Sequence, residues 1–188
     1  MNQKSRVGVN AMLFVIALVA LLADQLTKRA VEATLGFGEV MEIPGLSPYL
    51  TLTHSQNTGA AFSILQNSNT LIMGVAIVVG LIIVYYAPRL PAEDWVSRVG
   101  MGLQFGGAMG NLVDRLRQGW VTDFIHPQIP QIGFDWPVSN IADICIVGGA
   151  IILIASSIVQ DRQQKKLAAQ TTPRDNSDTD TEEIRIEK

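Results

Sequence analysis

The chain has little cysteine, little histidine and little charge, and each shortage excludes a class of protein. Among its 188 residues the one cysteine, Cys145, excludes an internal disulfide and any zinc site built from several thiolates. The two histidines, His54 and His126, lie far apart and form no HExxH motif, so a zinc hydrolase has no visible ligands. A net charge of −3 disfavours nucleic acid as a partner, and we expect no metal ion and no other cofactor.

Charged residues make up only 16% of the chain and hydrophobic residues 48%, which disfavours a water-soluble domain. Three apolar segments approach the roughly 20 residues that cross about 30 Å of hydrocarbon, namely Val9–Ala23, Thr70–Ala87 and Ile141–Val159. The first segment has no small-x-small cleavage site before Asp24, so we interpret it as a retained helix and not as a signal peptide. These segments predict an integral membrane protein.

A fourth segment, Trp95–Val113, is less hydrophobic but carries glycines at four-residue spacing. Gly102, Gly106 and Gly110 fall on one face of a helix, a pattern that suits close packing between membrane helices. The alternative is a Gly-rich loop outside the membrane. We expect a mainly α integral membrane fold with four transmembrane helices, a small extracytoplasmic β-sheet and an interfacial loop.

The distribution of basic residues predicts the orientation. With four spans, ten of the 14 Lys and Arg residues lie on the side of the termini, which places both termini in the cytoplasm of a multi-pass protein. Alternation in the segments that flank a Pro-Gly turn, Glu39–Ile43 and Tyr49–Thr53, predicts a small hairpin or sheet outside the membrane, and aromatic residues among prolines predict an irregular outer loop at about 116–139. We expect residues 1–160 to form the membrane domain and residues 161–188, rich in Thr, Asp and Glu, to be a disordered cytoplasmic tail.

Polar residues at the outer ends of the spans are candidates for function, because ionisable groups near hydrocarbon are costly. Asp24 and Lys28 share a helix face at i,i+4 spacing, which also suits a plain helix-end salt bridge. Asn57 stands near Gly59 in an Asn-Thr-Gly sequence that turn chemistry alone could explain.

A second group of polar residues surrounds two further carboxylates. The end of the third span carries Asn111, Asp114 and Arg115 on one face, where the arginine could hold an anionic group or extend to the lipid interface. Asp123 follows in the outer loop, and Asp143 begins the fourth span behind Asn140. Asn140 and Asp143 also resemble a helix cap. Two carboxylates at one membrane face could share a proton and act as general acid and base.

These residues occur in blocks that resemble lipoprotein signal peptidase, the signal peptidase II family, over roughly residues 9–160. The blocks stand in the order and near the spacings of that family: Asp24-Gln25-Leu26-Thr27-Lys28, Asn57-Thr58-Gly59-Ala60-Ala61-Phe62, Gly110-Asn111-Leu112-Val113-Asp114-Arg115, Val121-Thr122-Asp123-Phe124 and Asn140-Ile141-Ala142-Asp143. Ser139 departs from the pattern, because the family usually has an aromatic residue before the asparagine.

The resemblance implies a membrane aspartic endopeptidase of the bacterial inner membrane, with its active site near the outer face and its small extracytoplasmic sheet at about 37–66. Its substrates would be diacylglyceryl-modified prolipoproteins, cleaved just before the lipidated cysteine, and its other partner the membrane lipid; we expect it to act as a monomer. By the same resemblance Asp123 and Asp143 are the catalytic dyad, and the binding or supporting residues are Asn57, Gly59, Asn111, Arg115, Asn140, Asp24, Lys28 and Asp114. The alternatives from the residues alone are a small transporter or proton relay, and a structural membrane subunit.

Overall fold

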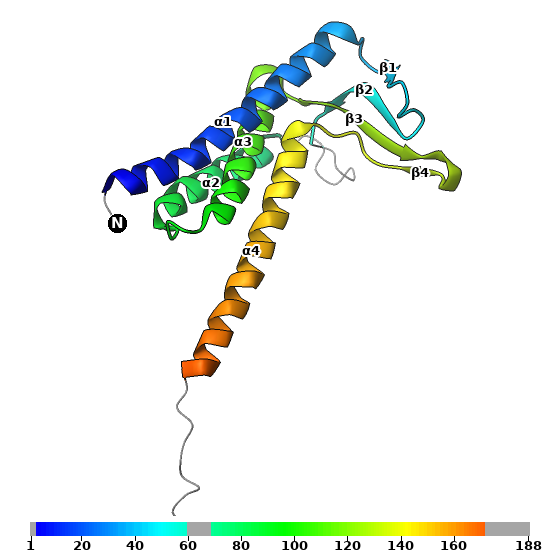
Figure 1. The fold of residues 1–188 in the computed structure, drawn as a ribbon. Coiled ribbons are helices and arrows are strands. Elements are labelled where there is room, and N and C mark those ends of the chain that lie inside the picture. Colours follow the sequence, from blue (N-terminus) through cyan, green and yellow to red (C-terminus); the bar gives the residue numbers. More distant parts are fainter. Residues whose placement is uncertain (1–2, 60–68, 172–188) are drawn as a thin grey trace, which may run out of the picture. The chain divides into compact units, whose positions relative to one another are not determined.

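A computed structural model describes residues 3–59 and 69–171 of the chain (Figure 1). The predicted sheet region ended at 66, so its last part lies outside the described residues. These residues form four long helices: α1 (Gln3–Thr34), α2 (Asn69–Tyr86), α3 (Trp95–Gln118) and α4 (Ile141–Thr171). Two short 3-10 helices, η2 (Ala87–Arg89) and η3 (Pro130–Ile132), lie in the connections.

Within the described part of the chain, three helices are long and apolar enough to cross a membrane, over Ala11–Thr34, Asn69–Arg89 and Ile141–Leu167. The prediction of a fourth span, over Trp95–Val113, is not confirmed. The physical reason lies in the composition of α3, whose buried residues include the polar side chains of Arg98, Asn111 and Asp114. A helix that turns polar groups toward the protein interior has a low average hydropathy even when it is long.

The glycines of α3 allow the helices to approach closely. A methyl group added at Gly102 would lie 2.8 Å from the carbonyl oxygen of Leu13, and one at Gly106 would collide with the carbonyl oxygen of Ala17. The predicted glycine face therefore contacts α1 (Figure 1). The same helix meets α4 through Gly107, where an added methyl group would be 2.5 Å from the carbonyl oxygen of Ala142.

A four-stranded antiparallel sheet of order β1-β2-β3-β4 follows the C-terminal end of α1 in Figure 1. Its strands are β1 (Val40–Glu42), β2 (Leu50–Asn57), β3 (Val121–Ile129) and β4 (Phe134–Asp135). The outer loop predicted at 116–139 as irregular was therefore partly wrong, because it supplies two strands. Cross-strand partners are far apart in sequence and local pattern does not reveal them.

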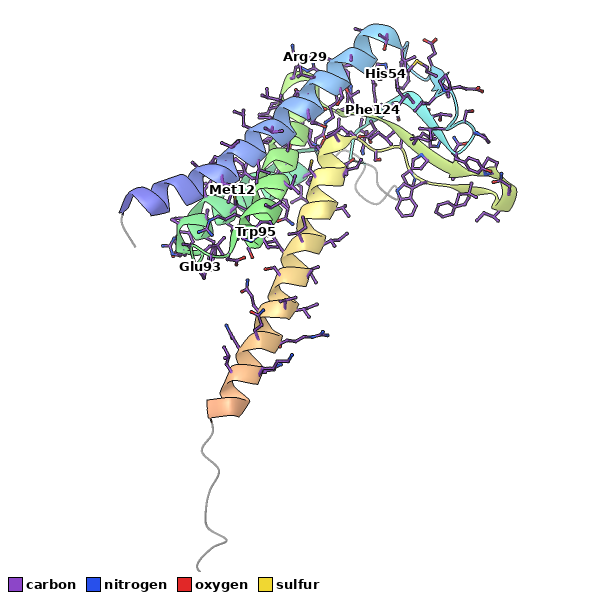
Figure 2. The ribbon with its side chains drawn as sticks, in the orientation of Figure 1. Met12, Arg29, His54, Glu93, Trp95 and Phe124 are labelled. Carbon is purple, nitrogen blue, oxygen red and sulfur yellow. The ribbon has the colours of Figure 1, made fainter. Side chains whose placement is uncertain are left out.

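Phe124 on β3 joins the sheet to the helices. Its side chain is buried against Val31 and Leu35 near the end of α1 (Figure 2). In contrast, Phe134 and Trp136 are more than two-fifths exposed. The strand that carries Asp123 is thus anchored on α1 by the residue that follows the carboxylate.

Contacts divide the chain into two compact units, Met1–Leu153 and Ile154–Lys188. All of the predicted site residues belong to the first unit. In the second unit, the described residues continue α4 and carry an exposed ion pair between Lys165 and Asp161. The disorder predicted from residue 161 onward was wrong for residues 161–171, because their Gln, Lys, Leu and Ala residues favour a helix and α4 continues to Thr171. The predicted boundary at residue 160 and the disorder of residues 172–188 stay predictions.

Candidate active site

Asp123 and Asp143 come from different elements, and a shared group of asparagines joins them. Asp123 lies on β3 and is 3% exposed, and its two carboxylate oxygens accept hydrogen bonds from Asn57 Nδ2 at 2.9 Å and Asn140 Nδ2 at 2.6 Å. Asp143 lies in the first turn of α4, where its Oδ1 accepts from Asn111 Nδ2 at 2.8 Å. Asn140 also donates to Asn111 Oδ1 at 3.2 Å, which closes the chain of hydrogen bonds between the two carboxylates.

The orientation of each asparagine amide is fixed by a neighbouring group that can donate a hydrogen bond but cannot accept one. The ammonium of Lys28 donates to Asn111 Oδ1 at 2.9 Å, and the backbone N–H of Asp143 donates to Asn140 Oδ1 at 2.9 Å. The backbone N–H of Gly59 donates to Asn57 Oδ1 at 2.9 Å. Since an amide has one acceptor oxygen and one donor nitrogen, each NH₂ group must face away from these donors. The three NH₂ groups therefore point at the carboxylates.

Behind the asparagines lies a buried ionic cluster. Lys28 forms ion pairs with Asp24 at 2.8 Å and with Asp114 at 2.9 Å, and all three side chains are at most 1% exposed. With Asn111 as the third acceptor, each ammonium proton has a partner. Gln25 Nε2 adds hydrogen bonds to Asp114 Oδ1 at 2.9 Å and to the carbonyl oxygen of Gly110 at 3.2 Å. The predicted Asp24–Lys28 pair is present, and it is part of a network that joins α1 to α3.

The start of α4 is fixed from two sides. Asn140 is the N-cap residue of α4, and its Oδ1 accepts the backbone N–H of Asp143 at position N3. Asp24 Oδ1 accepts the backbone N–H of Ala142 from across the bundle at 2.9 Å. The capping arrangement considered from the sequence is therefore real, with Asn140 as the cap. It leaves the carboxylate of Asp143 free of a capping bond among the hydrogen bonds of the described residues.

Arg115 lies at the same end of α3. Its Nη1 donates to the carbonyl oxygen of Asn111 at 3.3 Å, and its Nε is buried without a hydrogen-bond partner among the described residues. Gly59 is also buried and has a φ of 95°, a conformation that glycine adopts without strain. All ten predicted site residues are thus described, and nine of them share polar contacts in one connected group. The tenth, Gly59, joins through its backbone N–H alone.

The surroundings of Asp123 favour the protonated form of its carboxyl group. Burial, followed by the charge of Asp143, raises the pKa of Asp123 to about 7, against the opposing effect of the hydrogen bonds from Asn57 and Asn140. A carboxyl group normally titrates at about 4. This carboxyl can therefore hold a proton near neutral pH, as an acid catalyst must.

Sequence reasoning missed three residues that support this group. Gln25 stands inside the first sequence block, and Thr122 stands directly before Asp123, so adjacency to a predicted residue was the available signal. Thr122 is fully buried, and its backbone N–H donates to Asp114 Oδ2 at 3.2 Å. Glu32, which accepts a hydrogen bond from Thr122, had no signal beyond its i+4 spacing from Lys28.

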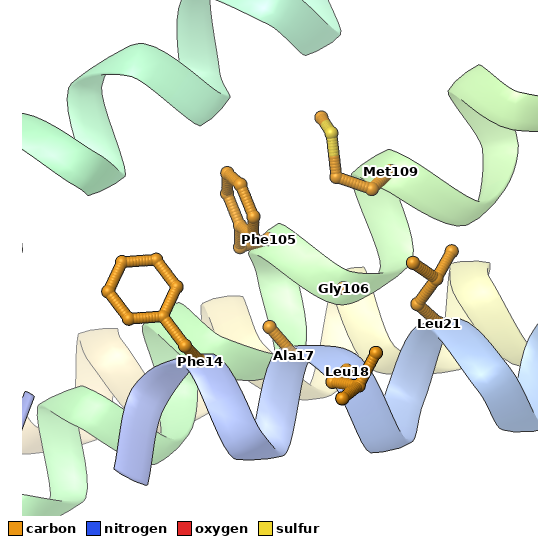
Figure 3. Close-up of a pocket in the computed structure, with 7 residues that line it drawn as sticks. All are labelled: Phe14, Ala17, Leu18, Leu21, Phe105, Gly106 and Met109. Carbon is orange, nitrogen blue, oxygen red and sulfur yellow. The ribbon is translucent and has the colours of Figure 1, made fainter. Parts of the chain in front are cut away.

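The site lies apart from an apolar hollow between α1 and α3 (Figure 3). Phe14, Leu18 and Leu21 of α1 line this hollow opposite Phe105, Gly106 and Met109 of α3. None of the described residues that line it has a side chain able to transfer a proton. Among the described residues, no group of three or more His, Cys, Asp or Glu side chains is arranged to hold a metal ion.

Comparisons with known proteins concern the fold and the family of the chain. A solved structure described as a bacterial membrane enzyme, determined by the in meso method at 2.3 Å resolution, has a TM-score of 0.70 and 31% identity, covering 82% of this chain and 92% of that one. The lipoprotein signal peptidases of Pelotomaculum thermopropionicum and Moorella thermoacetica are 43% and 39% identical, covering 75% and 73% of this chain and 88% and 87% of their own length.

The fold is thus that of a membrane enzyme with a polar site at the ends of its helices. Residues 16–159 match the family described as signal peptidase (SPase) II. The chain belongs to the signal peptidase II family, a family of proteases that process lipoproteins. The predicted family is confirmed, and it replaces the alternatives of a transporter and a structural subunit.

Proposed function

We propose that the chain is an aspartic endopeptidase that removes the signal peptide of diacylglyceryl-modified prolipoproteins just before the lipidated cysteine, with Asp123 and Asp143 as its catalytic dyad. The observation that carries the proposal is the pair of carboxylates joined by oriented asparagines. A second observation supports it, since the pKa of Asp123 is raised to about 7 by burial and by the charge of Asp143.

The reaction begins with one proton on the dyad, held by Asp123. Ionised Asp143 takes a proton from a water molecule, whose oxygen attacks the scissile carbonyl carbon while Asp123 donates its proton to the carbonyl oxygen. In the collapse of the tetrahedral diol, Asp123 takes back a proton from one hydroxyl. Asp143 then gives its proton to the departing nitrogen of the cysteine, which breaks the peptide bond and restores the dyad.

The surrounding residues have separate roles in this scheme. Asn57, Asn111 and Asn140 hold the carboxylates through NH₂ groups that cannot turn away. Arg115, whose Nε has no hydrogen-bond partner among the described residues, offers donors to a carbonyl or anionic oxygen of the substrate. Asp24, Lys28 and Asp114 fix α1, α3 and α4 around the site.

We further propose four spans, with α3 as the third, both termini in the cytoplasm and the site near the outer face of the bacterial inner membrane. The glycine contacts of α3 with α1 support this, because they belong to the packing of membrane helices. Tyr85, Tyr86 and Trp95 are exposed where α2 and α3 meet, as in the aromatic belt of a membrane interface. We also propose that the charged segment 161–188 is a cytoplasmic tail and that the protein acts as a monomer.

The test is cleavage of a purified prolipoprotein with and without its diacylglyceryl group, in detergent micelles. The lipidated substrate should be cleaved before its cysteine, and Asp123→Asn and Asp143→Asn should each abolish turnover in folded protein. Asp135→Asn is the matched control, because this carboxylate lies on β4, is 70% exposed and touches only His126 among the described contacts. Wild-type turnover by either folded dyad variant would disprove the mechanism.

A further inference from the structure

Three acidic and basic residues of α1 follow one another at four-residue spacing and reach three different elements. Asp24 accepts the N–H of Ala142 on α4, and Lys28 binds Asn111 and Asp114 on α3. Glu32 reaches β3, where Thr122 Oγ1 donates to its Oε1 at 2.6 Å. Residues four apart lie on one face of a helix. Glu32 is thus the residue of this face that contacts β3, the strand that carries Asp123.

The contacts of Thr122 show what Glu32 holds. Thr122 is 0% exposed, and its hydroxyl donates to Glu32 and accepts from Gln118 Nε2 at 2.9 Å. Its backbone N–H donates to Asp114 Oδ2 at 3.2 Å. The residue before the catalytic carboxylate is therefore tied on its side chain to the end of α1 and on its backbone to the buried ionic cluster.

The sheet pairs this part of β3 over a short length only, as Val121 with Asn57, Thr122 with Gln56 and Asp123 with Ser55, and the ladder is interrupted directly after Asp123. Leu52 pairs with Ile125, but Ser55 pairs with Asp123, so β2 has one extra residue between these pairs. A bulge of this kind disrupts local hydrogen bonding and bends the strand. On the other side of Thr122, Gly119 has a φ of 87° and reverses the chain from α3 into β3. The short paired segment between the turn and the bulge is therefore held by the contacts of Thr122 as well as by the sheet.

We infer that Glu32 is a positioning residue of the peptidase reaction, which places Asp123 by holding the Thr122 hydroxyl. This inference rests on the proposed dyad. A purely structural reading is that Glu32 only pairs with Arg117, whose Nη2 lies 2.7 Å from Glu32 Oε1 at a partly exposed site. The two readings predict different partners, because the positioning role depends on Thr122 and the structural role depends on Arg117.

The experiment measures kcat, KM and the pH profile of kcat for a small set of purified, full-length variants. Glu32→Ala and Thr122→Val should each lower kcat about tenfold with little change in KM, because a misplaced catalytic group costs rate more than binding. Their double variant should lose no more than the more impaired single variant, since both changes remove the same hydrogen bond between Thr122 and Glu32. Thr122→Ser keeps the hydroxyl and should restore kcat.

The pH profile separates positioning from loss of folded protein. When Asp123 moves from its place, water reaches it, and the alkaline limb of the kcat profile should shift to lower pH in Glu32→Ala and Thr122→Val. A smaller folded fraction would lower the whole profile without moving the limb. Arg117→Ala tests the structural reading, and Glu39→Ala is a matched control, because Glu39 accepts a backbone N–H from Gly36 at 2.8 Å and touches no residue of β3 among the described contacts.

Asp123→Asn belongs in the same set of variants. If it is inactive while Glu32→Ala and Thr122→Val keep wild-type kcat and pH profiles, the positioning role is overturned and the dyad stands. If Arg117→Ala reproduces the loss and Thr122→Val does not, the structural reading is correct. If folded Asp123→Asn is fully active, the dyad fails and the positioning role fails with it. Thr122→Val removes no charge, so it keeps the test valid even if Glu32→Ala does not fold.

Discussion

Replacing Lys28 by Met should separate the two roles of the buried cation, its charge balance and its orientation of Asn111. Methionine fills a similar volume but brings no charge and no donor. In the native cluster one ammonium faces the two carboxylates of Asp24 and Asp114, both 0% exposed. After the substitution both carboxylates stay buried without their cation.

Removing one partner of a buried ion pair costs about 3–5 kcal/mol, because an uncompensated charge remains inside. Folded proteins are stable by only about 5–15 kcal/mol, so Lys28→Met should lose a large part of the free energy of unfolding. Asp24 and Asp114 keep other donors, the N–H groups of Ala142 and Thr122, which argues for the lower half of the range. The measurement is an SDS titration of the protein in mixed micelles, followed by circular dichroism.

Adding Asp24→Asn to Lys28→Met should return at least half of the lost stability, because the net charge of the cluster goes back to its native value and an amide oxygen can still accept the N–H of Ala142. Activity should not return, since the amide of Asn111 has lost the donor that fixes it. Native stability of Lys28→Met would refute the assignment of a buried, charged cluster. Recovered cleavage by the double variant would refute the claim that Lys28 orients Asn111.

Four further predictions concern the pKa of Asp123, the glycine contacts of α3 and the membrane topology. Because burial and Asp143 raise the pKa of Asp123 to about 7, cleavage should fall about tenfold per pH unit above pH 7 in a rate profile, and a rate still rising at pH 8 would contradict this. Over the window from about pH 4 to 7 the folded state binds this proton more tightly than the unfolded chain does, so the free energy of unfolding should decrease as pH rises. Gly106→Ala should destabilise the protein by about 1–3 kcal/mol, since the added methyl group would meet Ala17 and Ala20, whereas Gly148→Ala, with open space around it, should be neutral in the same SDS titration. Reporter fusions after residues 45, 91 and 130 should read outside, inside and outside, and an inside signal at 130 would disprove the third span.

The sequence predicted what depends on spacing within one helix. The i,i+4 pair of Asp24 and Lys28, the cap at Asn140 and the glycine face of α3 all have a period that the chain itself displays, and the structure contains each of them. The hydropathy of the apolar segments likewise predicted the three helices that are long and apolar enough to span a membrane.

The sequence could not predict partners that only the fold brings together. Strand β3 pairs with β2 across more than sixty residues, and its aromatic and proline residues resembled an irregular loop. Asn57 meets Asp123, and Glu32 meets Thr122, only because this pairing places the strand beside α1. The buried polar side chains of α3 also lower its average hydropathy, so hydropathy alone does not identify this helix as a membrane span.

The position of the permanent charges relative to the dyad has a chemical consequence. A lysine in direct contact with Asp123 or Asp143 would favour the ionised form of both, and the pair would lose the proton that acid catalysis needs. In this structure Lys28 contacts Asn111, and Asn111 contacts Asp143, so a neutral amide separates the cation from the carboxylate. Accordingly, the charge of Lys28 is the smallest of the influences on the pKa of Asp123, after burial, Asp143 and two asparagines. The asparagines therefore transmit the fixed geometry of the ionic cluster to the dyad while leaving one carboxyl able to keep its proton.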